Sequence, residues 1–71
     1  MDREELLEIL RQGPTRIRMN DGRFYDVQST EFVSVSDIAA AVLFRHDDGK
    51  LRHVYLPLVT MSAVEPLPNG V

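Results

Sequence analysis

Histidine and aspartate side chains gather in one stretch of the chain, where His46, Asp47 and Asp48 are consecutive and His53 follows shortly after. Imidazole and carboxylate groups are common metal ligands, so this stretch is the strongest candidate for a metal centre. Asp47 and Asp48 precede Gly49, however, and this composition is typical of a tight turn. A three-residue turn at 47–49 pairs His46 with Lys50 and places it on the strand face opposite His53. In the other register the histidines share a face but stay two positions apart. We therefore predict no metal site.

Catalytic motifs are absent from the sequence. The serines lie in no nucleophile motif, and no glycine-rich loop precedes a helix, so neither covalent catalysis nor phosphate binding is indicated. Acid-base catalysis by paired carboxylates needs a pocket, and so short a chain leaves little room for one. We predict that the protein is not an enzyme and takes no cofactor and no small-molecule substrate.

One basic and aromatic surface stands out as a candidate binding face. It comprises Arg16, Arg18, Arg23 and Phe24, and Arg52 joins it if the sheet closes into a barrel. Charge combined with stacking is how proteins bind single-stranded nucleic acids. Asp21 and Asp26 lie among these arginines, though, and alternating charges are also typical of a solvated strand face. A solvated face, a protein-binding face and a nucleic-acid face all remain open, and the net charge of −3 weighs mildly against nucleic acid.

These arginines lie in a predicted β-hairpin over residues 15–27. Two alternating runs, about 15–19 and 23–28, flank the turn sequence Asn20-Asp21-Gly22. With a three-residue loop and Gly22 in the left-handed conformation, Ile17 faces Tyr25 on one side of the hairpin. On the other side Arg16 meets Asp26 and Arg18 meets Phe24. A two-residue loop would mix polar and apolar partners on both faces, so we favour the first register.

The chain begins with a predicted helix over residues 3–12. Asp2 is its N-cap, Glu5 completes a capping box, and Gly13-Pro14 ends it. Leu6, Ile9 and Leu10, with Leu7 beside them, form one apolar stripe. A helix this short is not stable alone, so the stripe must dock. We expect it to pack on the sheet or close one end of a barrel, with binding to a partner as the alternative.

The second half of the chain reads as further short strands. We expect a strand over residues 32–44, with Phe32 as a core residue, although the alanine-rich part 38–44 also fits a short helix. The turn signal after residue 44 and the strand pattern of 50–56 favour a strand there, because 50–56 needs an antiparallel neighbour. A last strand covers 60–65, and 66–71 is predicted to be a flexible tail.

One helix and about five short antiparallel strands predict a mainly β (α+β) single domain over residues 1–65. Two architectures fit: a small bent barrel of the SH3-like or Sm-like kind, which we favour, and an open sheet with the helix on one face. A 71-residue domain buries only about 60% of its unfolded surface and is marginal as a monomer. The chain has no cysteine, no signal-like start and no long apolar run, which predicts a cytoplasmic protein without membrane contact.

The pattern Ile17-x-Met19-x-Asp21-Gly22-Arg23-x-Tyr25-x-Val27 after a leading helix resembles the first motif of Sm-like proteins, which implies a small barrel. The Arg-Gly or Lys-Gly step of the second Sm motif is absent, since Leu56-Pro57-Leu58 stands there, so we assign no RNA-binding residues from it. The chain is also similar over most of its length to short uncharacterised bacterial proteins. They share the helix, this hairpin, the Glu31-Phe32 pair, the Asp-Asp-Gly turn and the ending at 64–67. That resemblance implies no established activity.

The leading functional hypothesis is a non-enzymatic protein-interaction or assembly module whose partner is either another protein or a second copy of the chain. It rests on the marginal size, a hydrophobic content of 44% and strand edges that invite pairing with another chain. The alternative is a small nucleic-acid-binding barrel that uses the face of Arg16, Arg18 and Arg23.

Overall fold

The computed structural model describes residues 1–67 and contains one α-helix, six strands and two short 3-10 turns. In chain order these are α1 (Arg3–Arg11), β1 (Thr15–Met19), β2 (Phe24–Val27), η1 (Thr30–Phe32), β3 (Val33–Val35), β4 (Ala39–Arg45), β5 (Leu51–Pro57), η2 (Leu58–Thr60) and β6 (Met61–Pro66). The mainly β class with a leading helix is therefore confirmed. No helix within residues 1–67 is long and apolar enough to cross a membrane.

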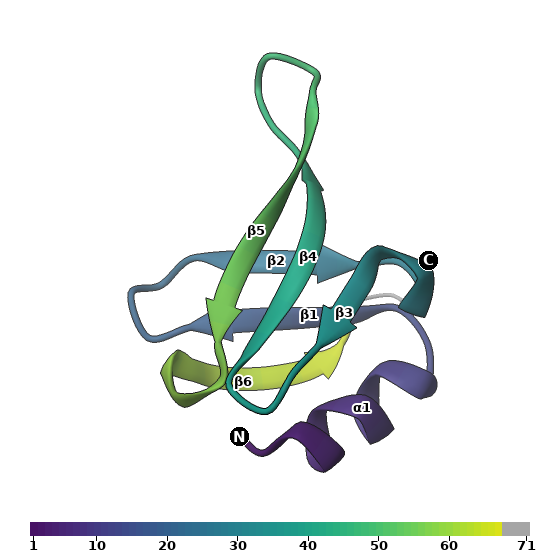
Figure 1. Ribbon diagram of the computed structural model, residues 1–71, viewed down its shortest axis with the longest axis vertical. Coiled ribbons are helices and arrows are strands. Elements are labelled where there is room, and N and C mark those ends of the chain that lie inside the picture. Colours follow the sequence, from purple (N-terminus) through teal and green to yellow (C-terminus); the bar gives the residue numbers. More distant parts are fainter. Residues whose placement is uncertain (68–71) are drawn as a thin grey trace.

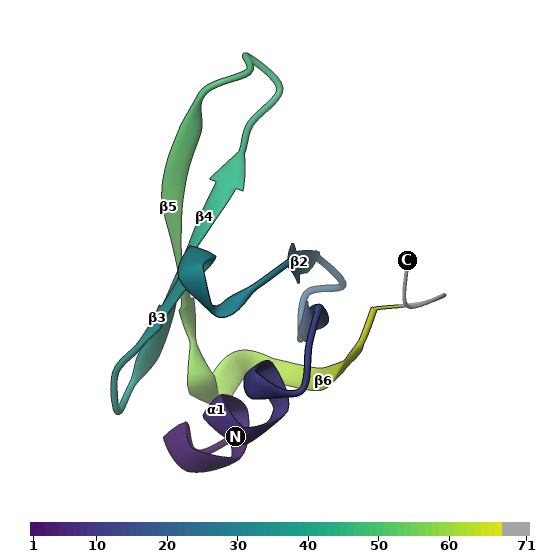
Figure 2. The same ribbon diagram turned by 90° about the vertical axis from the view of Figure 1, so that its right-hand side faces the viewer.

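The strands form two three-stranded antiparallel sheets, ordered β2-β1-β6 and β3-β4-β5. Figure 1 shows β4 and β5 crossing the first sheet steeply, and Figure 2 shows the two sheets as separate layers that meet near α1. The expected closed barrel is not formed, because no ladder joins β2 to β3 or β5 to β6 in this part of the chain. The physical reason lies in the connections: η1 and η2 turn the backbone away from the extended conformation at both places where a barrel would continue its hydrogen bonding.

The first hairpin has the predicted register. Arg16 pairs with Asp26, Ile17 with Tyr25, and Arg18 with Phe24. The Met19 amide donates to the Arg23 carbonyl at 2.8 Å, and the Gly22 amide donates back to the Met19 carbonyl at 3.0 Å. Gly22 has φ +91°, a conformation that glycine adopts without a Cβ penalty, so the turn sequence sets the pairing.

Residues 38–44 lie in or beside a strand, as the turn signal after them predicted, since β4 covers Ala39–Arg45. A single strand over 32–44 is wrong, however. The chain reverses at 36–38 so that β3 pairs antiparallel with β4, with Val33 opposite Val42. The Ser36 hydroxyl accepts the amides of Ile38 and Ala39 at 3.3 and 3.2 Å, which holds this turn.

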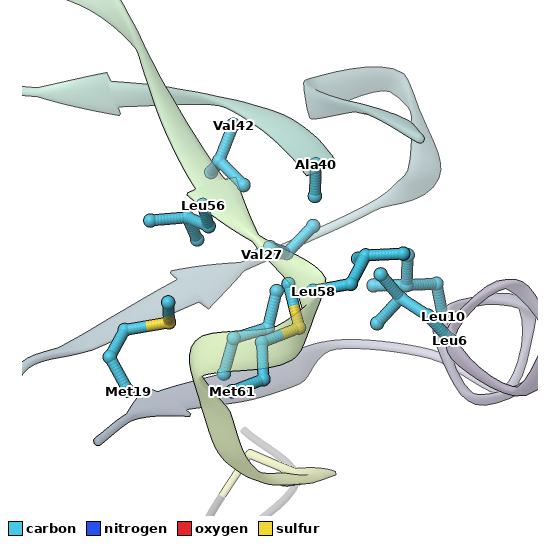
Figure 3. Close-up of a cluster of buried hydrophobic side chains, with 10 residues drawn as sticks. Leu6, Leu10, Met19, Val27, Ala40, Val42, Leu56, Leu58 and Met61 are labelled. Atoms are coloured by element: carbon cyan, nitrogen blue, oxygen red, sulfur yellow. The ribbon is translucent and has the colours of Figure 1, made fainter. Parts of the chain in front are cut away.

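The helix begins and ends almost where its caps predicted. The Asp2 carboxylate accepts the Glu5 amide at 2.8 Å, and this hydrogen bond lowers the pKa of Asp2 below its ordinary value. Leu6 and Leu10 are buried and enter the core, whereas Leu7 and Ile9 are half-buried. Figure 3 shows both leucines pointing into the space between the sheets. The helix therefore packs against the sheets, as expected.

The core gathers residues from α1, η2 and all the strands except β3. Its buried members are Leu6, Leu10, Ile17, Met19, Val27, Ala40, Val42, Leu56, Leu58 and Met61 (Figure 3). Because the core draws on both sheets, it holds the two layers together without a continuous hydrogen-bond ladder.

Two further expectations need correction. Phe32 is 41% exposed and is not a core residue, because it ends η1 and lies before β3 begins. The predicted tail starts too early: Pro66 belongs to β6, and Leu67 is buried with its amide bonded to the Pro14 carbonyl at 3.0 Å. The rest of that tail, 68–71, lies outside the described residues.

Candidate functional site

The predicted arginine face is a network of ion pairs. Arg16 donates through Nε and Nη2 to the two carboxylate oxygens of Asp26 at 2.7 and 3.0 Å. This bidentate hydrogen bond raises the pKa of Arg16. Arg18 reaches across to β6, where its Nε lies 2.7 Å from Glu65. The outer face of the first sheet therefore balances each of these guanidinium groups with a carboxylate.

Phe24 lies on the same face, where its side chain is 47% exposed and two arginines contact its ring. The Arg16 guanidinium carbon lies 4.1 Å from the ring centroid, and that of Arg18 lies 5.8 Å from it. The expected contact of Arg18 with Phe24 is present, and the diagonal contact with Arg16 is closer. These arginines compete for the ring with any base that stacks on Phe24.

The remaining two arginines of the predicted face lie elsewhere. Arg23 is at the hairpin turn, 3.6 Å from Asp21, and Arg52 is on β5 in the second sheet, bonded to Asp48 at 2.6 Å. Because the barrel does not close, β5 is not joined to the first sheet by a ladder. The structure thus brings Arg16, Arg18 and Phe24 together but does not add Arg52 to them.

The candidate metal ligands form the predicted turn. The His46 amide donates to the Lys50 carbonyl at 3.0 Å, so 47–49 is a three-residue loop and His46 and His53 lie on opposite faces. Asp48 accepts the Lys50 amide at 2.9 Å, and this bond, with the one from Arg52, lowers the pKa of Asp48. Among residues 1–67 no group of three or more potential ligand side chains is placed to hold a metal ion.

His46 is oriented by aromatic neighbours. Its ring meets that of Phe44 edge to face at 5.4 Å, and Phe44 meets Tyr25 of the first sheet in the same way at 5.3 Å. The Nε2 atom of His46 is buried without a hydrogen-bond partner within the described part of the chain. These contacts fasten the projecting β4–β5 hairpin to β2.

The outer edge of β5 carries backbone groups that no other strand within residues 1–67 satisfies. In an antiparallel ladder, residue pairs alternately exchange two hydrogen bonds or none. The pair His46 and Lys50 is hydrogen-bonded, and at the other end of the β4–β5 pairing the Leu58 amide donates to the Ile38 carbonyl at 2.9 Å. These two pairs fix which residue pairs between them are hydrogen-bonded. The amides and carbonyls of Leu51, His53 and Tyr55 belong to the non-bonded pairs and therefore point away from β4. We call these three residues the β5 edge.

A cleft of about 340 Å³ lies beside the C-terminal half of β5. Residues 54–57 of β5 form one wall, Met19, Tyr25 and the turn of the first hairpin form the other, and Thr60 lies at the end. The Asn20 amide donates to the Thr60 carbonyl at 2.8 Å, which ties the hairpin turn to η2 there. Tyr55 is 72% exposed at this cleft, so an aromatic side chain stands free next to unpaired backbone groups.

Sequence reasoning predicted exposed strand edges in general but identified neither this edge nor the cleft. The cleft depends on the gap between the two sheets, which local patterns do not specify. The sequence of β5 nevertheless contained a signal. Leu51 and Tyr55 lie on one face of the strand and Val54 and Leu56 on the other, so both faces carry apolar side chains. Such a pattern is typical of a strand that is covered on both faces, yet here the outer face of β5 is exposed.

Comparison with known proteins found no matching family model, no matching curated protein and no matching solved structure.

Proposed function

We propose that the protein is a small non-enzymatic interaction module that binds an extended polypeptide strand along the β5 edge. The observation that carries this proposal is the coincidence of three free backbone positions with an adjacent cleft. In strand addition, main-chain hydrogen bonds supply affinity and pockets for alternate side chains supply specificity. The β5 edge offers the first and the cleft offers the second.

The side chains at the edge support this function. Proteins usually protect a free edge with lysine, proline or an inward-pointing charge. The outward-bonding positions Leu51, His53 and Tyr55 carry no lysine and no proline. Arg52 between them is an inward-pointing charge, but it is paired with Asp48 at 2.6 Å, and Pro57, which has no amide hydrogen, lies beyond them. A partner strand therefore meets no repulsive charge at these three positions when His53 is neutral.

The nucleic-acid alternative has less support from the geometry. Nucleic-acid affinity comes largely from cations that neutralise phosphates. Arg16, Arg18 and Arg52 each lie within 2.7 Å of a carboxylate oxygen, so the charge of each is already balanced within the chain. We further propose that the fold is an open variant of the SH3-like and Sm-like small barrels, because β6 returns to β1 after a short 3-10 turn and the middle strands form a meander.

Peptide selection followed by mapping of the bound site tests the function. Short extended peptides selected from a display library against the purified chain are titrated into ¹⁵N-labelled protein and followed by amide chemical shifts. We expect the largest shifts at Leu51, His53 and Tyr55 and at the cleft residues Met19 and Tyr25. Peptides that shift only the Arg16, Arg18 and Phe24 surface would refute strand addition.

A matched pair of variants separates backbone from side-chain recognition. His53→Pro removes an outward amide without touching the bonds to β4, whereas His53→Ala keeps that amide and removes only the imidazole. We expect His53→Pro to weaken peptide binding about tenfold or more, equivalent to roughly one hydrogen bond, and His53→Ala to change it little. Circular dichroism and the amide spectrum verify that both variants are folded. Equal affinity in the two variants would contradict the proposal.

A further inference from the structure

The partner strand at the β5 edge is, we propose, β5 of a second copy of this chain, paired antiparallel with its centre at His53. This inference rests on the proposed strand addition and names its occupant. The result is a two-fold symmetric dimer in which the two second sheets join into one continuous sheet.

The register follows from which backbone groups are free. Centring on His53 places Leu51 opposite Tyr55 of the second copy and His53 opposite its own equivalent, so every outward amide and carbonyl of both edges is used. Sliding the second copy by two residues in one direction brings Pro57 into a bonded position, where it has no amide hydrogen to donate. Sliding it in the other direction brings Gly49, which belongs to the turn, into that position. One register therefore satisfies the edge better than its neighbours.

The side chains are self-complementary in this register. On the outer face Leu51 packs against Tyr55 of the second copy, two apolar groups that are now 50% and 72% exposed. On the inner face Arg52 lies opposite Val54 of the second copy, and its charge stays bonded to its own Asp48. No two like charges oppose each other when His53 is neutral.

The same register also brings oppositely charged groups of the two copies to the cleft. The same register places Lys50 of the second copy opposite Leu56, which belongs to the cleft wall. The other wall carries Asp21, whose only ion pair within residues 1–67 is the 3.6 Å contact with Arg23. The cleft thus receives the turn of the second copy's hairpin and offers a carboxylate to its lysine.

The hairpin geometry leaves the pairing region accessible. Figure 1 shows the upper part of β4 and β5 projecting beyond the first sheet, and Figure 2 shows the same projection from the side. An interface made by one edge strand is smaller than the roughly 800 Å² per partner of a standard complex. We therefore expect a dissociation constant in the micromolar range, near −8 kcal/mol on the usual conversion.

Single cysteines test the register, because the chain has none of its own. In the bonded pair at the centre the two Cα atoms lie about 5.5 Å apart, within the disulfide range. His53→Cys is therefore expected to give a covalent dimer under mild oxidation. Leu51→Cys alone is not, since the equivalent residues lie four positions apart, about 13 Å along the strand. Mixing Leu51→Cys with Tyr55→Cys protein restores cross-linking. Ser34→Cys, exposed on β3, is the control and is expected to form no covalent dimer.

Light scattering on the unmodified protein separates failure of this inference from failure of strand addition. A mass of two chains with the cross-linking pattern above supports the inference. A monomer at about millimolar concentration, ten to a thousand times the expected constant, overturns it. So does a dimer whose cross-links form through Ser34→Cys or equally through Leu51→Cys. If selected peptides still shift the β5 edge in such a protein, the proposed function stands and only the second copy is excluded. If neither occurs, both proposals fail.

Discussion

At the scale of single residues, the most informative groups are aspartates in turns. Asp21 accepts the Arg23 amide at 2.9 Å, and Asp48 accepts the Lys50 amide at the same distance. Each aspartate precedes a glycine and closes a three-residue loop, so the two hairpins share one turn chemistry. Asp48, a carboxylate of the stretch that contains His46, thus serves backbone geometry.

Asp48 makes folding stability depend on pH in the acid range. Its pKa is held below the ordinary 3.8 by the Lys50 amide and by Arg52. The folded state therefore prefers the carboxylate, and the resulting stability is present above the unfolded pKa and lost as the pH falls through the folded value. We expect Asp48→Asn to lower the urea midpoint at neutral pH, with the difference fading below about pH 4. Asp47→Asn is the control in the same turn. A difference that persists at acid pH would contradict this.

Burial distinguishes isoleucines that the sequence presents as equals. Ile17 is fully buried on β1, whereas Ile38 is 78% exposed in the β3–β4 turn. We expect Ile17→Val to lower the free energy of unfolding by about 1 kcal/mol, because a methylene is lost from the packed core. Ile38→Val is expected to stay within about 0.5 kcal/mol of the wild type. Urea unfolding measures both, and equal effects would refute the assignment of the core.

At the scale of elements, the turns define the strands that they join. Gly22 and Gly49 both have positive φ, and nothing lies within 4 Å of a Cβ placed at either position. Their requirement is therefore conformational and not steric. The hairpins form because glycine enters the left-handed region where other residues pay for strain.

A substitution series at Gly49 tests this requirement. Gly49→Ala, at φ +82°, is expected to destabilise the fold by about 1 kcal/mol through backbone strain. Gly49→Asn is expected to cost less, because asparagine enters this region more readily. Denaturant unfolding gives both values. If alanine and asparagine cost the same, the conformational explanation is wrong.

At the scale of the whole molecule, a shared core joins the two sheets, and no hydrogen-bond ladder between strands of residues 1–67 connects them. The chain is short, and a domain of this size has little stability to spare. Pairing through β5 adds backbone hydrogen bonds and covers Tyr55, so association and stability are coupled.

This coupling predicts a melting temperature that depends on concentration. We expect the midpoint of thermal unfolding to rise with protein concentration, because mass action favours the folded dimer. His53→Pro is expected to weaken the dependence, and His53→Ala is the matched control that keeps it. Calorimetry or circular dichroism across a hundredfold range of concentration, about 3 kcal/mol of mass action, is sufficient. An invariant midpoint in the wild-type protein would contradict dimerisation in this range.

The sequence was sufficient for the features that depend on neighbouring residues. Asp2 and Gly13-Pro14 delimit the helix, and Asn20-Asp21-Gly22 sets the register of the first hairpin. Asp47-Asp48-Gly49 predicted the second turn but left its register open. Each rests on a side chain that bonds nearby backbone or on a glycine that admits a positive φ. The Arg16–Asp26 pair and the contact of Arg18 with Phe24 followed directly from the register of the first hairpin.

Only the tertiary structure decided how the strands close. Local patterns did not reveal that residues 36–38 would turn the chain back, that Phe32 would stay outside the core, or that η1 and η2 would interrupt the ladders. Sheet closure depends on contacts between residues distant in sequence, and a break of a few residues at each connection is enough to prevent it. The free β5 edge and its cleft are consequences of those breaks, which is why the candidate site became visible only in three dimensions.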